Sequence, residues 1–264
     1  MNLASTVRMR ALALAVLAGI AALALLLVPP IMQWPEYHHF ADHRTFLRIP
    51  NFANVLSNLP FLRIGFLGMV LVLRMRTFLE GSERWPYFIF FLGITLTCFG
   101  SSYYHWNPND QRLLWDRLPI TMAFMGLFGG IIGERLGLRL ARWLLPWLIV
   151  LGVASVLFWQ RTGDLRPYVF VQFFPILAIP LMLAWFPPRY NRTADFFVVL
   201  GFYIAAKLCE LLDMQIFRAG GFISGHTLKH LLAAMAAYWL YRMLALRKPV
   251  ASLPQTAAVA GGSA

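Results

Sequence analysis

Charged residues are scarce in this 264-residue sequence. Asp, Glu, Lys and Arg together make up 13% of it, which is about half the share of roughly 25% that is usual in soluble domains. This scarcity excludes a disordered chain and argues against an ordinary soluble enzyme. Two cysteines, Cys98 and Cys209, are too few for a small disulfide scaffold. Both fall within apolar runs, so we expect two free thiols.

What the sequence has in abundance is apolar residues, which account for 59% of it. A bilayer core of about 30 Å needs a helix of roughly 20 apolar residues. The runs of this kind are 11–32, 52–73, 87–105, 117–134, 140–160, 167–186, 193–214 and 226–246. Open sheets are not possible in lipid, and the runs are too long for barrel strands. The predicted fold class is therefore an all-α integral membrane protein.

The net charge of +12 comes from 23 basic residues against 11 acidic ones. In a polar protein this excess would point to nucleic acid, but in one this apolar it indicates orientation in the membrane. If the N-terminus is cytoplasmic, 13 of the basic residues lie in inside segments, seven in outside loops and three within helices. We therefore predict eight spans with both termini inside, and no nucleic-acid partner.

The first apolar run has two interpretations. Arg8 and Arg10 before it are typical of a signal peptide, but its apolar stretch exceeds the usual length of about 7–15 residues. We favour a retained transmembrane helix over a cleaved one. The predicted division of the chain is an N-terminal helix with an outer loop over 1–50, a seven-helix core over 51–246 and a disordered tail over 247–264.

Ionisable residues inside the predicted spans are the main clue to function, because each costs roughly 2.5–3.5 kcal/mol to insert. His226 and His230 are four residues apart at the start of the last span, so their side chains share one helix face. That spacing suits two imidazole ligands of one metal ion. His105 is the natural third ligand, because the predicted topology brings the outer end of its span to the same membrane face.

Further polar residues reach this face in the predicted topology. Ser101 is four residues before His105 and lies on the same side of the helix. Asp116 follows across a turn, where a carboxylate can orient an imidazole or accept a proton from a metal-bound water. The candidates for supporting the metal ligands from the seventh span are Lys207, Glu210 and Asp213.

Each of these residues also has a simpler interpretation. A single His-x-x-x-His pair more often caps a helix or forms hydrogen bonds, and Ser101 alone is typical of helix packing. Asp116 alone is a first-turn carboxylate favoured by the helix dipole. Lys207 and Glu210 alone are an i, i+3 ion pair. The joint arrangement is what favours a metal site.

The first outer loop contains a rival histidine cluster. His39 and His43 are also four residues apart, and His38 is adjacent in sequence. Nothing in this loop predicts a helix strongly. A polar lid over the cavity is therefore the favoured interpretation, and a second metal site is the alternative.

The order of the motifs resembles that of the alkaline ceramidases, which belong to the CREST superfamily of membrane hydrolases. Their Ser-x-x-x-His motif is similar to residues 101–105, which read Ser-Ser-Tyr-Tyr-His. Their Leu-Leu-Asp-Glu-Leu-Pro motif is similar to residues 113–119, which read Leu-Leu-Trp-Asp-Arg-Leu-Pro. The opening of their first core helix is similar to residues 54–58, Asn-Val-Leu-Ser-Asn, and their last helix carries a pair like His226 and His230. The resemblance covers about residues 51–246.

The resemblance implies a seven-helix core, to which this chain adds one N-terminal helix. It implies a catalytic zinc ion held by three histidines, His105, His226 and His230. It further implies that Asp116 transfers protons and that Ser101 stabilises an oxyanion, while Asp213 matches a family aspartate. Arg117 stands where the family has a glutamate, so a different substrate preference is expected.

The family also binds calcium, through an Asp-Trp-x-Glu segment and a glutamate just before its first core helix. Of the segment only Trp34 and Glu36 remain here, and Asn51 stands where the glutamate would be. Two carboxylates are therefore missing. This argues against calcium binding unless Asp42 compensates.

The favoured function is a zinc-dependent amidase that hydrolyses ceramide or another N-acyl lipid by metal-activated water, with this lipid and the bilayer as partners. The alternative is a non-enzymatic receptor-like or lipid-binding protein with structural zinc. A third hypothesis is a transporter that relays protons through Lys207, Glu210 and Asp213, although the sequence lacks the paired, broken helices of many transporters. Short loops and an Ala/Arg-rich composition point to a bacterial inner membrane, with the site facing the periplasm.

Overall fold

The computed structural model describes residues 3–74 and 78–250, and the regular secondary structure of this part is helical, with isolated backbone bridges in the segments between helices. The long helices are α1 (Leu3–Leu27), α3 (Leu59–Leu73), α4 (Arg84–Trp106), α5 (Asp110–Arg135), α6 (Leu138–Thr162), α7 (Arg166–Trp185), α8 (Ala194–Leu211) and α10 (Gly225–Leu246). The short ones are η1 (Pro35–His38), α2 (Phe52–Leu56), η2 (Gly81–Glu83) and α9 (Asp213–Gly220). The predicted all-α class is confirmed.

Four helices differ from the predicted spans. Helix α5 begins at Asp110, seven residues before the predicted start at 117. The first span ends at Leu27, before two prolines that cannot donate a backbone hydrogen bond. The second is divided between α2 and α3, because Ser57 and Asn58 hydrogen-bond to the carbonyl oxygen of Asn54 instead of extending a regular helix. The seventh ends at Leu211, and Asp213 begins the separate helix α9.

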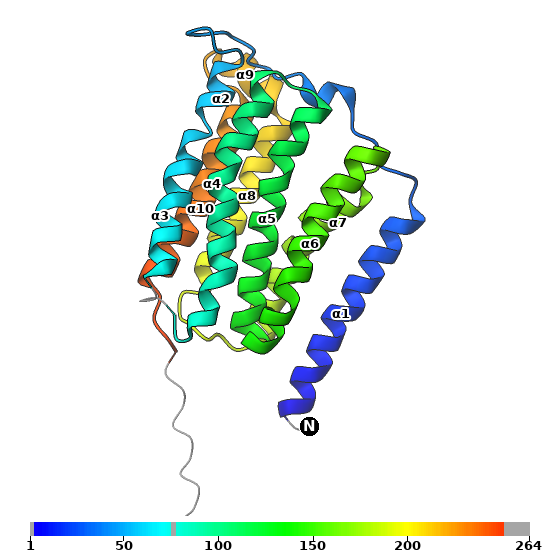
Figure 1. Ribbon diagram of the computed structural model, residues 1–264, viewed down its shortest axis with the longest axis vertical. Helices are drawn as coiled ribbons and strands as arrows, with labels where there is room; N and C mark the ends of the chain where they lie inside the picture. The colour runs from blue at the N-terminus through cyan, green and yellow to red at the C-terminus, as the bar shows by residue number, and fades with distance from the viewer. Residues whose placement is uncertain (1–2, 75–77, 251–264) are drawn as a thin grey trace, which may run out of the picture.

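The long helices lie side by side and run alternately up and down (Figure 1). Helix α1 stands at the edge of the bundle and packs against α7. The start of α1 and the end of α10 lie at the lower end of the view, whereas α2 and α9 lie at the upper end (Figure 1). An even number of crossings thus returns the chain to the end where it began.

Among the described residues, five helices are long and apolar enough to cross a membrane, which is consistent with a membrane protein. These helical stretches are Ser5–Leu27, Phe52–Leu73, Gly81–Trp106, Leu138–Thr162 and Arg166–Trp185. The other long helices, α5, α8 and α10, carry charged or polar residues among their apolar ones, as Lys207 and Glu210 in α8 show. Helix α1 leaves most of its apolar side chains exposed, as in Leu26 at 69% and Leu27 at 78%, and such a continuous apolar surface marks contact with lipid or protein.

Two glycines allow helices to approach closely at the upper end. A Cβ atom at Gly100 in α4 would lie 2.0 Å from the carbonyl oxygen of Trp115 in α5. A Cβ atom at Gly225 in α10 would lie 2.1 Å from the carbonyl oxygen of Cys209 in α8. These contacts set the spacing of the helices that carry the polar residues.

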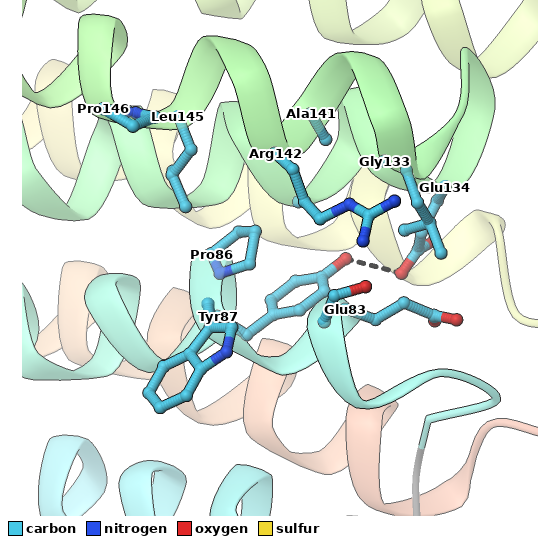
Figure 2. Close-up of a pocket in the computed structure, with 13 residues that line it drawn as sticks. Glu83, Pro86, Tyr87, Gly133, Glu134, Ala141, Arg142, Leu145 and Pro146 are labelled. Carbon is cyan, nitrogen blue, oxygen red and sulfur yellow. Dashed lines mark hydrogen bonds between the residues drawn. The ribbon is translucent and has the colours of Figure 1, made fainter.

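The lower end of the bundle is closed by a buried network of charged and aromatic side chains. Tyr87 donates a hydrogen bond of 2.6 Å to Glu134 beside a cavity of about 220 Å³ (Figure 2). Arg247 forms a buried ion pair with the same carboxylate and stacks 3.9 Å from the centre of the Tyr190 ring. Arg247, which the sequence places in the tail, is therefore buried in the bundle. Residues 248–250 are exposed and hydrogen-bond to residues 189–191 through the backbone, and the rest of the predicted tail lies outside the described residues.

Candidate metal centre

Three buried histidines meet at the upper end of the bundle. His105 lies in the last turn of α4, and His226 and His230 lie in the first two turns of α10. Their ring centroids are 4.8–4.9 Å apart, and one nitrogen from each ring lies within 4.8 Å of the other two. The structure thus brings together the three side chains that the sequence analysis selected, and the group can hold a metal ion.

The separation of two of the ring nitrogens fits two ligands of one tetrahedral zinc ion. The Nε2 atoms of His105 and His226 are 3.3 Å apart. Zinc–nitrogen bonds of about 2.0–2.1 Å at tetrahedral angles place two ligand nitrogens about 3.3–3.4 Å apart. Ser57 Oγ lies 2.8 Å from His230 Nδ1, which leaves His230 Nε2 free for a metal. A hydrogen bond of this kind fixes the orientation of a ligating ring.

The backbone around the histidines is held by two polar side chains. Asp213 accepts hydrogen bonds from the backbone N–H of His226 at 2.7 Å and of Ala41 at 2.9 Å. It therefore ties the start of α10 to the loop that precedes α2. Asn51 donates a hydrogen bond of 2.8 Å to the carbonyl oxygen of His105. Both contacts restrict the helix ends from which the three rings project.

Ser101 and Asp116 face each other across the close contact of α4 and α5. Both residues are buried, and the Ser101 side chain is a hydrogen-bond partner of the Asp116 carboxylate. The Oδ1 atom of Asp116 is buried without a hydrogen-bond partner among the described residues. Both residues line the same cavity as His230. The predicted serine and aspartate therefore adjoin the histidine group.

Lys207 and Glu210 form the i, i+3 ion pair that the simpler interpretation predicted. Lys229 of α10 joins them with an ammonium nitrogen 2.7 Å from the Glu210 carboxylate. The same ammonium lies 3.4 Å from Nε2 of His226, so this charged cluster adjoins the histidine group. Tyr37 donates a hydrogen bond of 3.4 Å to Glu210 from the outer loop.

A cavity of about 770 Å³ leads from these polar residues into the bundle. At its polar end lie Ser101, Asp116 and His230, together with the Lys207–Glu210–Lys229 cluster. Its remaining walls are mostly apolar side chains of α4, α5, α7, α8 and α10, which include Phe90, Leu183 and Phe196. A long apolar chamber with a few polar groups at one end is typical of a site for an amphipathic ligand.

The rival cluster of the first outer loop does not form a metal group. Within residues 3–74 and 78–250, the one group of three or more such ligands close enough to share an ion is the three-histidine group. His38 instead contacts the Tyr104 hydroxyl at 3.0 Å and Asp110 at 3.1 Å. The ring of Phe40 lies 4.6 Å from that of His105, so this loop covers the histidines.

The remnant of the calcium segment makes other contacts. Trp34 and Glu36 are exposed. Asp42 is bound by the side chain of Arg44 at 2.7 and 2.8 Å, and this hydrogen bonding lowers the pKa of the Asp42 carboxyl group below its usual value. Asn51 donates a hydrogen bond to the carbonyl oxygen of His105, as described above. Asp42 therefore supports the loop, and Asn51 supports the histidine group.

Several contributors to the site were not assigned a role from the sequence. Ser57 lies in the Asn-Val-Leu-Ser-Asn stretch, so the motif was visible but its contact with His230 was not, and Asn51 was considered only in relation to calcium. Lys229 lies between the two paired histidines and was counted only as a charge within a helix. Arg117 was expected only to change the substrate preference, and it lies buried inside α5.

No protein-family model matches this chain, and no curated protein matches it in sequence. Function is therefore inferred from the geometry of the site and from the spacing of its motifs. The geometry establishes a buried group of metal-type ligands next to a carboxylate, a hydroxyl and a large apolar chamber.

Proposed function

We propose that this protein is an integral membrane amidase of the alkaline ceramidase type, which uses zinc to hydrolyse the amide bond of a ceramide-like lipid. The observation that carries the proposal is the position of the three-histidine group. Its member His230 lines the polar end of a chamber of about 770 Å³, together with a buried carboxylate and a buried hydroxyl. Zinc lowers the pKa of a coordinated water to about 7 and polarises a carbonyl group.

His105, His226 and His230 would hold the ion through neutral imidazole nitrogens. Ser57 keeps the Nδ1 side of His230 occupied, so that Nε2 is presented to the ion. Asp213 fixes the backbone of His226, and Asn51 fixes that of His105. Three protein ligands leave one position of a tetrahedral ion open, as in catalytic zinc sites.

Asp116 and Ser101 supply the remaining chemistry. An Asp116 carboxylate oxygen accepts a proton from the attacking water and returns it to the amide nitrogen as the C–N bond breaks. The Ser101 hydroxyl donates a hydrogen bond to the oxygen of the tetrahedral carbon, where negative charge develops. Water is consumed, and the products are a fatty acid and an amine.

The chamber explains why such a site would lie in a membrane protein. Its apolar walls suit the acyl chain, which would enter from the bilayer between helices and leave the amide at the polar end. We further propose eight spans with both termini in the cytoplasm. In a bacterial inner membrane, the upper end in Figure 1 would then face the periplasm.

The proposal is tested with the purified full-length protein in detergent. We expect about one zinc ion per chain by elemental analysis and release of fatty acid from ceramide. His226→Ala should lose both the metal and the activity. His43→Ala, in an exposed histidine of the outer loop, should keep both. Full hydrolysis by a zinc-free His105→Ala/His226→Ala protein would contradict the proposal.

Asp116→Asn separates an enzyme from a non-enzymatic zinc protein. It should retain zinc and fold but lower kcat by about 10²–10⁴-fold, because it removes the proton acceptor. A receptor or lipid-binding protein has no need of this carboxylate. If the wild type binds zinc and lipid but never turns over any N-acyl lipid, the non-enzymatic alternative replaces the amidase.

A further inference from the structure

Arg117 is a buried cation in the wall of the large chamber. It lies in the second turn of α5, next to Asp116, and only 5% of its surface is exposed. Burial of a guanidinium group is unfavourable unless the charge is compensated. The partners of Arg117 therefore indicate whether its charge is satisfied within the protein.

The protein compensates this charge only in part. The guanidinium carbon lies 4.1 Å from the ring centroid of Trp159, 4.7 Å from that of Tyr168 and 5.7 Å from that of Tyr37. Nη2 donates a hydrogen bond to the side-chain oxygen of Gln33. Nη1 is buried and has no hydrogen-bond partner among the described residues. Arg117 forms no ion pair with any described carboxylate.

The acidic residues of the chamber have other partners. Glu210 is shared by two lysines and by the Tyr37 hydroxyl. Asp116 is the partner of Ser101 on the opposite helix. Glu36 also lines the chamber but is exposed at the outer loop. An anion for Arg117 can therefore come from a ligand in the chamber.

We propose that Arg117 binds a carboxylate on the amine side of the substrate, so that the substrate class is N-acyl amino acids and not only neutral ceramides. This inference rests on the proposed amidase function and names its substrate. The aromatic rings hold the plane of the guanidinium, and its parallel N–H groups match the two oxygens of a carboxylate.

The position of Arg117 in the chamber indicates that the bound carboxylate belongs to the amine part of the substrate. Arg117 follows Asp116, the residue that would protonate the leaving nitrogen. Its contacts Gln33 and Tyr37 belong to the outer segment, whereas the apolar walls for an acyl chain extend toward Phe196 at the other end of the chamber. Hydrolysis adds water across the C–N bond and yields a fatty acid and a free amino acid.

The test compares two lipids with the same acyl chain, N-oleoylglycine and N-oleoylethanolamine, which differ in a carboxylate against a hydroxymethyl group. Binding is measured with the full-length protein in detergent at neutral pH, in parallel with hydrolysis. We expect the wild type to bind N-oleoylglycine at least about ten-fold more tightly. Arg117→Gln should remove this preference, and Arg161→Gln, in an exposed arginine near the end of α6, should retain it.

Equal affinity of the wild type for the two lipids overturns the inference, and so does a preference that survives in Arg117→Gln. If Arg117→Gln does not fold, the wild-type preference and the variant Arg117→Lys decide, since lysine keeps the charge but loses the paired donors. Oleate, the fatty-acid product, is measured as a third ligand. If Arg117→Gln loses affinity for oleate but not for N-oleoylglycine, the arginine binds the carboxylate of the acyl side and the assignment to the amine side is wrong. A carboxylate preference without hydrolysis of either lipid contradicts the amidase but not the carboxylate site.

Discussion

The two ring nitrogens of His230 have different surroundings, and this difference is a property of single residues. Ser57 lies 2.8 Å from Nδ1, which leaves Nε2 as the nitrogen available to the three-histidine group. Residues that orient a metal ligand through a hydrogen bond typically contribute 10- to 100-fold to metal affinity, as an order of magnitude. Ser57 is thus a positioning residue for the proposed ion.

Ser57→Ala should weaken zinc binding by about 10- to 100-fold, because it removes the hydrogen bond that orients His230. The dissociation constant is measured by competition with a chromophoric chelator. Ser57→Thr, which keeps a hydroxyl, should restore part of the affinity. Ser102→Ala, which removes a neighbouring hydroxyl bound to the Val55 carbonyl oxygen, serves as the control. An unchanged affinity in Ser57→Ala would show that the contact has no part in metal binding.

The Asp42–Arg44 pair predicts a pH dependence of stability. Arg44 lowers the pKa of Asp42 in the folded protein. The carboxylate therefore stabilises the fold fully above its unfolded pKa of about 3.9, and this contribution is lost as the pH falls through the lower, folded pKa. The melting temperature of the wild type should fall below about pH 4 more steeply than that of Asp42→Asn. Glu36→Gln should follow the wild type, and parallel curves for all three proteins would refute the prediction.

At the scale of elements, the contact between α8 and α10 depends on the absence of a side chain at Gly225. An added Cβ would meet the carbonyl oxygen of Cys209 at 2.1 Å and the Cα of Asp213 at 2.7 Å. These are backbone atoms, so the start of α10 would have to move. His226 is the next residue and would move with it.

Gly225→Ala should destabilise the fold by about 1–3 kcal/mol, as overpacking usually does, and should also lower the zinc content. The melting temperature and elemental analysis measure the two effects on the same sample. Gly201→Ala in α8, where nothing lies within 4 Å of the added Cβ, is the matched control and should change neither. Normal zinc content in Gly225→Ala would mean that the site does not depend on this contact.

Periodicity in the sequence accounts for these elements only in part. Apolar runs predict where the long helices lie, because burial in lipid or in a core requires such runs. The ends of helices depend on single side chains, such as Ser57 and Asn58, which divide one predicted span into α2 and α3. A local window cannot show this division, because both residues are compatible with a helix.

At the scale of the whole molecule, two ends with different chemistry close the bundle. The upper end holds the histidine group and the lower end holds the Glu134–Arg247 ion pair. Arg247 follows α10, so this pair links the last helix to α5. We interpret this ion pair as the contact that stabilises the lower end of the bundle.

Glu134→Gln should destabilise the protein by about 3–5 kcal/mol, because it removes the carboxylate that compensates a buried arginine. Glu80→Gln affects an exposed pair with Arg189 and should change stability by less than about 1 kcal/mol. Unfolding in detergent followed by circular dichroism measures both variants. Equal stability of Glu134→Gln and Glu80→Gln would contradict a stabilising role for the Glu134–Arg247 pair.

The sequence by itself determined the helical class, the approximate helices and the pair His226 and His230, because these depend on composition and on local spacing. It also selected His105, Ser101 and Asp116, from the topology that the charge distribution predicted. Only the tertiary structure decided how Ser57 meets His230, how Arg247 meets Glu134 and how three aromatic rings surround Arg117. These contacts join residues far apart in the chain, and they depend on the rotation and close approach of packed helices, which local periodicity does not specify.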